Sequence, residues 1–212
     1  MRIIKTKYDE NYFENLFYRG SSNSQRNKNR IREILEYKIN GALLEVGCGK
    51  GNFLKEAEKY FDVTGFDVSN YAINEAKKML GNKVSVENIE QTDLRPNHYD
   101  VIVAFNLLEH LKNPNNAIKK IYGALKNGGI LIGSVPNNYG VVGGLATLLF
   151  NAIDKTHCST YSPHIWNKYF LKHGFKDILF FGEIATGINN NFYVKNIFWK
   201  FLSFNLMFVC KK

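Results

Sequence analysis

Cysteine is scarce in this chain, which contains only Cys48, Cys158 and Cys210 among its 212 residues. The odd number excludes a framework in which every cysteine is paired, and the spacing matches no pattern of metal ligands. The first residues, MRIIKTKYDENYF, lack the continuous apolar core of a signal peptide. We therefore expect a reduced, cytoplasmic setting.

Long hydrophobic runs are also lacking. Val141–Ile153 is too short to cross a bilayer, and Phe192–Val209 is interrupted by Lys195, Asn196 and Lys200. We predict no transmembrane segment and interpret both stretches as buried or lid elements. A peripheral contact with a membrane, through a lipid-linked substrate, stays open.

Acidic residues are fewer than basic ones, 19 against 28, which gives a formal net charge of +9. The densest basic cluster is Arg26, Lys28, Arg30 and Arg32. Such a balance indicates solubility and a basic surface, and it allows a nucleic-acid partner. No stacked-aromatic RNA motif accompanies the charge, so a nucleic-acid partner is disfavoured and kept as an alternative.

The most informative stretch is Leu43–Phe53, which has the pattern of a strand, a tight glycine turn and the start of a helix. Its glycines, at every second position after Glu45, allow a sharp turn and a close approach of backbone to ligand. A dinucleotide fingerprint, G-x-G-x-x-G, requires a third glycine where this chain has Asn52. The stretch therefore predicts a small-molecule site of another kind.

A second strand, Val63–Ser69, contains an acid, Asp67, 20 residues after Gly47. An acid at this place can accept hydrogen bonds from both hydroxyls of a ribose. Ser69 is placed to cap the helix that continues to Leu80. The spacing predicts a ribose-containing ligand without naming it.

Alternation of apolar runs and helical patterns continues along the chain. Predicted helices cover Tyr8–Tyr18, Ser24–Tyr37, Phe53–Tyr60, Asn116–Leu125 and Asn191–Phe204, and a C-cap turn covers Lys126–Gly129. The remaining predicted strands are Val84–Ile89, Tyr99–Phe105, Ile130–Val135, Asp177–Glu183 and Leu206–Lys211.

Four segments agree with one family in order and spacing: E-x-G-x-G-x-G from Glu45, the acid Asp67, "SVPN" from Ser134, and "D-x-T-H" from Asp154. Together they resemble class I S-adenosylmethionine (SAM) methyltransferases of the type 11 and type 23 groups. The resemblance implies an α/β, Rossmann-like, seven-stranded sheet in the order 3-2-1-4-5-7-6, with the last strand antiparallel and helices on both faces. It implies a single domain over 1–212, with N-terminal helices in 1–40 and a lid insertion over 138–160.

The same resemblance implies which residues bind SAM, whose demethylated product is S-adenosylhomocysteine. They are Glu45, Gly47, Cys48, Gly49, Gly51, Asp67, Val68, Asn88, Ile89 and Asn106. The family's adenine-binding Asp aligns with Asn88, and Asp93 is the alternative. Arg26 or Arg30 could reach the SAM carboxylate, but a solvated helix face is the interpretation we favour for both.

For catalysis, His157 is the first candidate base and His110 the second. His157 could instead brace a helix entry, with Asp154 and Thr156 forming local turn bonds. Glu109 and His110 fit a substrate-facing role and a bracing role equally well. Metal-dependent small-RNA methyltransferases have E-x-x-E-H here, and because Asn106 replaces the first Glu we infer no metal.

The resemblance implies methyl transfer to a small molecule, and the "D-x-T-H" segment resembles enzymes tied to surface glycans and secondary metabolites. A sugar hydroxyl of a surface glycan or its precursor is therefore the expected acceptor. Two alternatives are an RNA (tRNA) methyltransferase and a non-catalytic SAM-binding subunit. The sequence predicts neither the acceptor's identity nor the oligomeric state.

Overall fold

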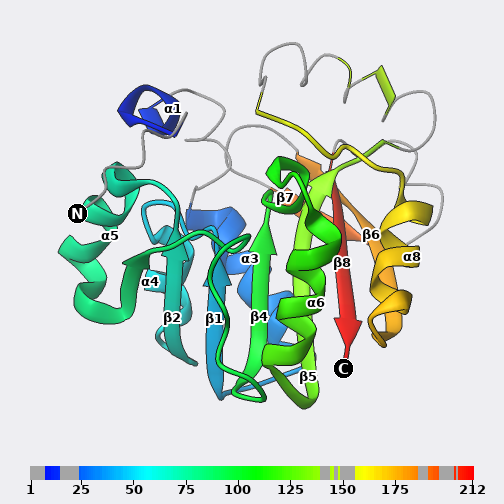
Figure 1. Ribbon diagram of the computed structural model, residues 1–212, viewed down its shortest axis with the longest axis horizontal. Coiled ribbons are helices and arrows are strands. Elements are labelled where there is room, and N and C mark those ends of the chain that lie inside the picture. Colours follow the sequence, from blue (N-terminus) through cyan, green and yellow to red (C-terminus); the bar gives the residue numbers. More distant parts are fainter. Residues whose placement is uncertain are drawn as a thin grey trace.

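A computed structural model of the chain describes residues 8–14, 24–138, 144–145, 148, 156–185, 191–195, 203 and 205–212. Within these residues a single mixed sheet lies between two layers of helices (Figure 1). The strands are β1 (Ala42–Val46), β2 (Asp62–Asp67), β3 (Val84–Val86), β4 (Tyr99–Phe105), β5 (Leu125–Pro136), β6 (Lys176–Ala185), β7 (Asn191–Val194) and β8 (Asn205–Lys211). The helices are α1 (Glu10–Glu14), α3 (Ser24–Leu35), α4 (Asn52–Ala57), α5 (Asn70–Leu80), α6 (Pro114–Ala124) and α8 (Pro163–Lys172), with short 3-10 turns η1 (Gly81–Lys83) and η2 (Leu108–His110).

The strand order is β3-β2-β1-β4-β5-β8-β6-β7. The first five of these strands are parallel, whereas β8 is antiparallel to both of its neighbours, β5 and β6. Since β6 and β8 are the predicted sixth and seventh strands, the predicted order and the antiparallel last strand are confirmed. The parallel strands end at one edge of the sheet, where ligands bind in open α/β sheets.

One prediction was wrong at the far edge. Asn191–Val194 was predicted as the start of a helix, but it forms β7, an eighth strand paired antiparallel with β6. Two aromatic residues and a β-branched residue in four positions favour a strand, and β6 offers an unpaired edge on that side. The rest of the predicted helix, 196–204, lies outside the described residues except for Ser203.

The two layers of helices bury separate cores. Helices α3, α4 and α5 cover one face, where Ile34, Leu54 and Ile73 are fully buried against the strands. Helices α6 and α8 cover the other, where Ile118, Trp166 and Phe170 fill the same role. The sheet is thus closed on both faces, and its carboxyl edge is the place left for a site.

Local signals explain where the elements near that edge begin. The Ser69 hydroxyl accepts the Ala72 N–H at 3.2 Å, so α5 starts directly after the tip of β2, as predicted. The predicted turn Lys126–Gly129 is instead part of β5, because α6 ends at Ala124 and the strand passes through a bulge before Ile130. Gly128, with a φ of 74°, absorbs that irregularity.

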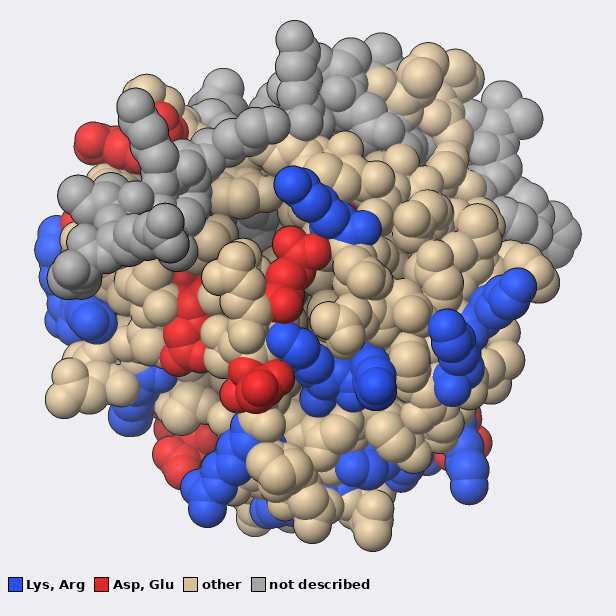
Figure 2. All heavy atoms as spheres, viewed as in Figure 1, with Lys and Arg blue, Asp and Glu red and all other residues tan. Residues whose placement is uncertain are grey.

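The predicted lid over 138–160 falls largely on residues 139–143, 146–147 and 149–155, which lie outside the described part of the chain. Among the described residues, no helix is both long and apolar enough to span a membrane. Figure 2 shows Lys and Arg side chains over α6 and α8, with Asp and Glu side chains toward β1 and β2.

Candidate active site

The turn after β1, residues 47–51, forms a cradle of backbone, and its glycines have left-handed conformations. Gly47, Gly49 and Gly51 have φ values of 76°, 51° and 76°, which L side chains rarely adopt. A Cβ on Gly47 would lie 2.8 Å from Leu107, and one on Gly51 would lie 2.6 Å from Leu80. The N–H groups of Gly47 and Cys48 donate to the Phe66 carbonyl at 2.8 and 3.0 Å, which fixes the turn against β2.

Asp67 joins the cradle to the start of α5. Its Oδ2 accepts the Gly49 N–H and its Oδ1 accepts the Ser69 N–H, each at 2.9 Å. Burial raises the pKa of this carboxyl, and the backbone N–H groups of Ser69, Gly49 and Val68 oppose the rise. Each oxygen keeps acceptor capacity for a further donor, so the pair suits two adjacent hydroxyl groups.

The predicted solvated face of α3 is wrong for its two inward arginines. Arg26 and Arg30 are buried, with 7% and 4% of their surfaces exposed. Arg26 forms a bidentate pair with Glu183 of β6, its Nε donating to Oε1 at 2.6 Å and its Nη2 donating to Oε2. The Glu183 carboxylate on β6 thus holds α3 against the sheet. Arg26 and Glu183 are 157 residues apart in the sequence, so only the tertiary fold brings them together.

Arg30 lies over Phe105, at the end of β4. Its guanidinium carbon is 4.0 Å from the centre of the Phe105 ring, and its Nη1 is 3.5 Å from Asn27 Oδ1. Its Nε and Nη2 are buried and make no hydrogen bond with any described residue. Burial first, and then the charge of Arg26, lower the pKa of Arg30 to about 10.

Glu45, the acid of the glycine motif, interacts electrostatically with Arg30. It is buried, and its Oε2 likewise makes no hydrogen bond with any described residue. Burial raises the pKa of this carboxyl well above its ordinary value, although the positive charge of Arg30 opposes the rise. A buried acid and a buried cation with unused hydrogen-bonding atoms therefore lie behind the cradle.

The loop after β3 carries the predicted adenine contacts. Asn88 Oδ1 accepts the Glu90 N–H at 2.9 Å, and Ile89 is buried. The ammonium group of Lys120 on α6 donates to the carbonyl groups of Ile89, Glu90 and Thr92 at 3.1, 3.3 and 2.9 Å. By contrast, the Asp93 side chain is 99% exposed.

Asn106 follows β4 in a left-handed conformation with a φ of 47°. Its N–H donates to the Ser134 carbonyl at 2.9 Å, and the Ser134 hydroxyl donates to its Oδ1 at 2.7 Å. These bonds tie the ends of β4 and β5 together and turn the chain into η2. Asn106 thus lies next to the cradle, because Leu107 is the side chain that approaches Gly47.

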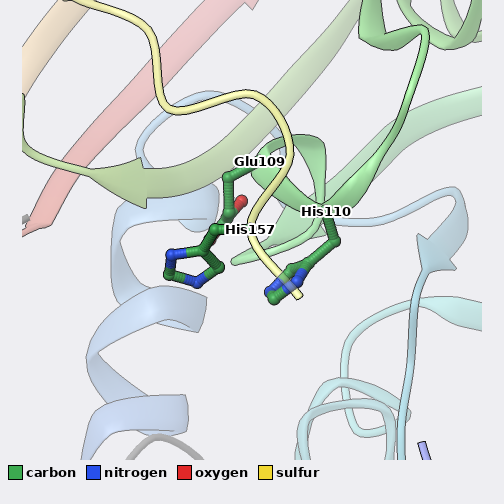
Figure 3. A group of neighbouring side chains, drawn as sticks. All are labelled: Glu109, His110 and His157. Atoms are coloured by element: carbon green, nitrogen blue, oxygen red, sulfur yellow. The ribbon is translucent and has the colours of Figure 1, made fainter. Parts of the chain in front are cut away.

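The two candidate histidines meet beyond η2. The ring centres of His110 and His157 are 4.7 Å apart, at an interplanar angle of 66°. Figure 3 shows the Glu109 side chain beside them, with Glu109 and His110 on η2 and His157 on the neighbouring loop. Ligand atoms of the three residues all lie within 4.8 Å of one another.

Thr156, one of the two residues considered for local turn bonds, contacts a residue far away in the sequence, and Asp154, the other, lies outside the described residues. The Thr156 hydroxyl oxygen is 2.8 Å from His110 Nδ1, so it contacts the other histidine. The N–H groups of Cys158 and Ser159 both donate to the Glu109 carbonyl at 2.8 Å. The backbone of Glu109 therefore braces the loop, while its buried side chain joins the histidines.

The N-terminal segment packs over the same edge of the sheet. The Ser69 hydroxyl donates to the Tyr8 carbonyl at 2.6 Å, and the Tyr8 ring lies 6.0 Å from that of His110. Lys50 of the cradle pairs with Glu14 of α1. Helical spacing gave α1 itself, but nothing in its sequence named these partners.

Comparison with known proteins supplies the family. A model for a methyltransferase domain matches residues 12–179. A ubiquinone biosynthesis O-methyltransferase of Nitrosomonas europaea is 35% identical over 117 residues, which are 51% of this chain and 49% of that protein. This chain spans about half the length of the curated relatives it matches.

Solved structures share the fold at lower identity. A SAM-dependent methyltransferase of Archaeoglobus fulgidus has a TM-score of 0.74 at 19% identity, over 96% of this chain and all of that one. Phosphoethanolamine N-methyltransferase 2 of Haemonchus contortus, in complex with SAM, has a TM-score of 0.66 at 15% identity, over 87% of this chain and 52% of that one.

Proposed function

This chain belongs to the methyltransferase domain family, and we propose that it transfers the methyl group of SAM to a hydroxyl group of a small molecule. SAM dependence is common to the family and to the structural neighbours. The hydroxyl acceptor is suggested by the curated relatives, whose names specify O-methylation. The observation that carries the proposal is the Asp67 carboxylate, bonded at once to the cradle and to α5.

The described residues fit SAM on their own geometry. Asp67 offers acceptors for the two ribose hydroxyls, and Asn88 and Ile89 are the adenine contacts, in preference to the exposed Asp93. Arg30 supplies unused N–H donors for the carboxylate of the methionine part, and Glu45 supplies a carboxylate for its ammonium group. Gly47, Cys48, Gly49, Gly51, Val68 and Asn106 form the backbone around these contacts.

Methyl transfer requires alignment more than activation. When bound, SAM supplies a methyl group already activated by its positively charged sulfur. Asn88 and Ile89 hold the adenine end of the cofactor and Arg30 and Glu45 hold the methionine end, so the line of attack is set by the fold. His157, with His110 as second candidate, receives the proton that the acceptor hydroxyl loses when its oxygen bonds to the methyl carbon.

The acceptor we favour is a phenol-type or quinol-type hydroxyl. The relatives are named for ubiquinone biosynthesis, and their names give no support to the glycan hydroxyl expected from the "D-x-T-H" segment. Tyr161, Trp166 and Tyr169 pack ring against ring, with Trp166 buried in the core and the two tyrosines half-buried against it.

The net charge of +9 allowed an RNA acceptor, but the positions of the basic side chains give it less support. The densest basic cluster contributes Arg26 and Arg30 to the interior, which leaves only Lys28 and Arg32 of that cluster exposed. Methylation of tRNA with salt-sensitive binding would favour RNA over a small molecule.

The test begins with calorimetric titration of SAM and S-adenosylhomocysteine. Wild type should bind both, whereas Asp67→Ala should weaken binding at least a hundredfold and Gly49→Val should abolish it. Circular dichroism should show that both variants are folded. A radiolabelled methyl screen over phenols, catechols, sugars and tRNA then identifies the acceptor. Wild-type affinity in both variants would contradict the site.

A further inference from the structure

Helix α3 places two arginine side chains side by side in the interior. Arg26 and Arg30 are four residues apart, a spacing at which helix residues are neighbours and like charges repel. Both are buried, and a buried arginine is rare unless an acid pairs with it. Among the described residues, Arg26 has such a partner in Glu183, whereas no hydrogen bond joins Arg30 to an acid. Stability alone does not explain the second arginine.

Both oxygens of the Glu183 carboxylate are occupied by other donors. Arg26 Nε donates to Oε1 at 2.6 Å and Arg26 Nη2 donates to Oε2, which also accepts a hydrogen bond from Asn205 Nδ2 of β8 at 3.4 Å. A bidentate pair between a guanidinium and a carboxylate is stronger and more directional than a single bond. Arg26 therefore holds the acid in the geometry that Arg30 would need.

Glu183 nevertheless acts on Arg30 through space. After burial, the charges of Arg26 and Glu183 have the largest effects on the pKa of Arg30, and Arg26 lowers it while Glu183 raises it. The guanidinium of Arg30 lies instead over Phe105, with its Nε and Nη2 making no hydrogen bond with any described residue. An attractive acid is therefore within range of Arg30, and the Arg26 guanidinium already occupies it.

We propose that Arg26 is a positioning residue: by occupying Glu183 it keeps Arg30 over Phe105, where the unused N–H donors of Arg30 meet the carboxylate of SAM. The proposal rests on the proposed function, in which Arg30 contacts that carboxylate. In this arrangement neither Arg26 nor Glu183 touches the cofactor. Without Arg26, the buried carboxylate of Glu183 would be left without its cation, which is costly, and pairing with Arg30 would relieve that cost.

Three variants separate this role from that of a simple anchor for α3. Arg26→Met should let Arg30 leave Phe105 and pair with Glu183. The double variant Arg26→Met, Glu183→Gln removes the acid as well, so Arg30 should return to Phe105, and Glu183→Gln alone should leave it there. If the pair merely anchored α3, all three variants would displace Arg30, and the double variant would rescue nothing.

The position of Arg30 is measured without any ligand, by NMR of the arginine Nε–H groups in the full chain. In wild type the Arg30 resonance, assigned by its absence from Arg30→Met, should be shifted upfield because the guanidinium carbon lies 4.0 Å from the centre of the Phe105 ring. Arg26→Met should lose the upfield shift, whereas both variants that carry Glu183→Gln should keep it. Arg32→Met, at an exposed position of α3, is the control. If Arg26→Met does not fold, Arg26→Lys, whose ammonium cannot make the bidentate pair, should lose part of the shift.

Calorimetry then links that position to the cofactor, with decarboxylated SAM as the ligand that lacks the carboxylate. One charged hydrogen bond corresponds to a preference for SAM of about 10- to 150-fold, which Arg26→Met should lose and the double variant should regain. An upfield shift that survives unchanged in the Arg26 variant tested, or that is missing from wild type or from the double variant, would overturn the proposal. The expected shifts without a wild-type preference for SAM would instead support the positioning by Arg26 and contradict the cofactor contact in the proposed function.

Discussion

Arg30 allows a test in which stability and cofactor affinity change differently. Arg30→Met removes the guanidinium but keeps an unbranched side chain that can pack on Phe105, where the guanidinium carbon now lies 4.0 Å from the ring centre. The lost charge is buried, and its Nε and Nη2 make no hydrogen bond with described residues. The substitution removes the desolvation cost of Arg30 and its repulsion with Arg26, and Glu45 can stay protonated because burial raises its pKa, so the melting temperature should stay or rise.

Affinity for SAM should fall in the same variant. Hydrogen bonds between charged groups contribute about 1.5 to 3 kcal/mol each, and 1.4 kcal/mol is about tenfold in affinity. One such contact between Arg30 and the cofactor carboxylate corresponds to a Kd about 10 to 150 times higher. Arg32→Met, at an exposed position of the same helix, is the matched control.

The assay compares calorimetric Kd values for SAM and for decarboxylated SAM, which lacks the group that Arg30 is proposed to contact. Wild type should prefer SAM, and Arg30→Met should bind the two ligands almost equally. The reasoning is refuted if the variant keeps the wild-type preference, or if its affinity for both ligands falls by the same factor.

Three further changes test other parts of the site. Lys120→Met removes the ammonium that holds three carbonyls of the adenine loop, so the KM for SAM should rise about tenfold with kcat unchanged, and Lys119→Met is the exposed control. Because burial raises the pKa of Glu45, the folded chain holds that proton more tightly than the unfolded chain, and urea unfolding should show stability falling as pH rises above about 4.5. Glu45→Gln should reduce that slope and leave the part due to Asp67, whose pKa burial also raises, and an unchanged slope would contradict the assignment. His157→Ala should reduce kcat at least a hundredfold with SAM affinity within twofold of wild type; full turnover would make His157 structural.

Elements set by local signals could be predicted from the sequence. Tyr99–Phe105 forms β4 with the predicted bounds, because a continuous apolar run between polar residues has few alternatives. Ser69 caps α5, and the alternate glycines adopt the left-handed turn that their spacing required. Asp67 lies at the cradle because β1 and β2 are adjacent parallel strands that end at the same edge of the sheet.

Features that depend on distant partners could not be predicted. Arg26 belongs to a helix whose pattern suggests a solvated face, yet its partner Glu183 is 157 residues away. Thr156 contacts His110 across 46 residues, and no spacing rule connects them. The strand at Asn191–Val194 also forms because β6 offers it an edge, which is a property of the assembled sheet.

The position of β8 between β5 and β6 has a consequence for synthesis. Until residues 205–211 have left the ribosome, a nascent chain has no strand to fill that gap, and β6 has no neighbour through which to join the parallel strands. The unpaired edge of β5 would be exposed in the meantime and could pair with other chains. A chain truncated before residue 205 should therefore accumulate as aggregate rather than as a smaller folded protein.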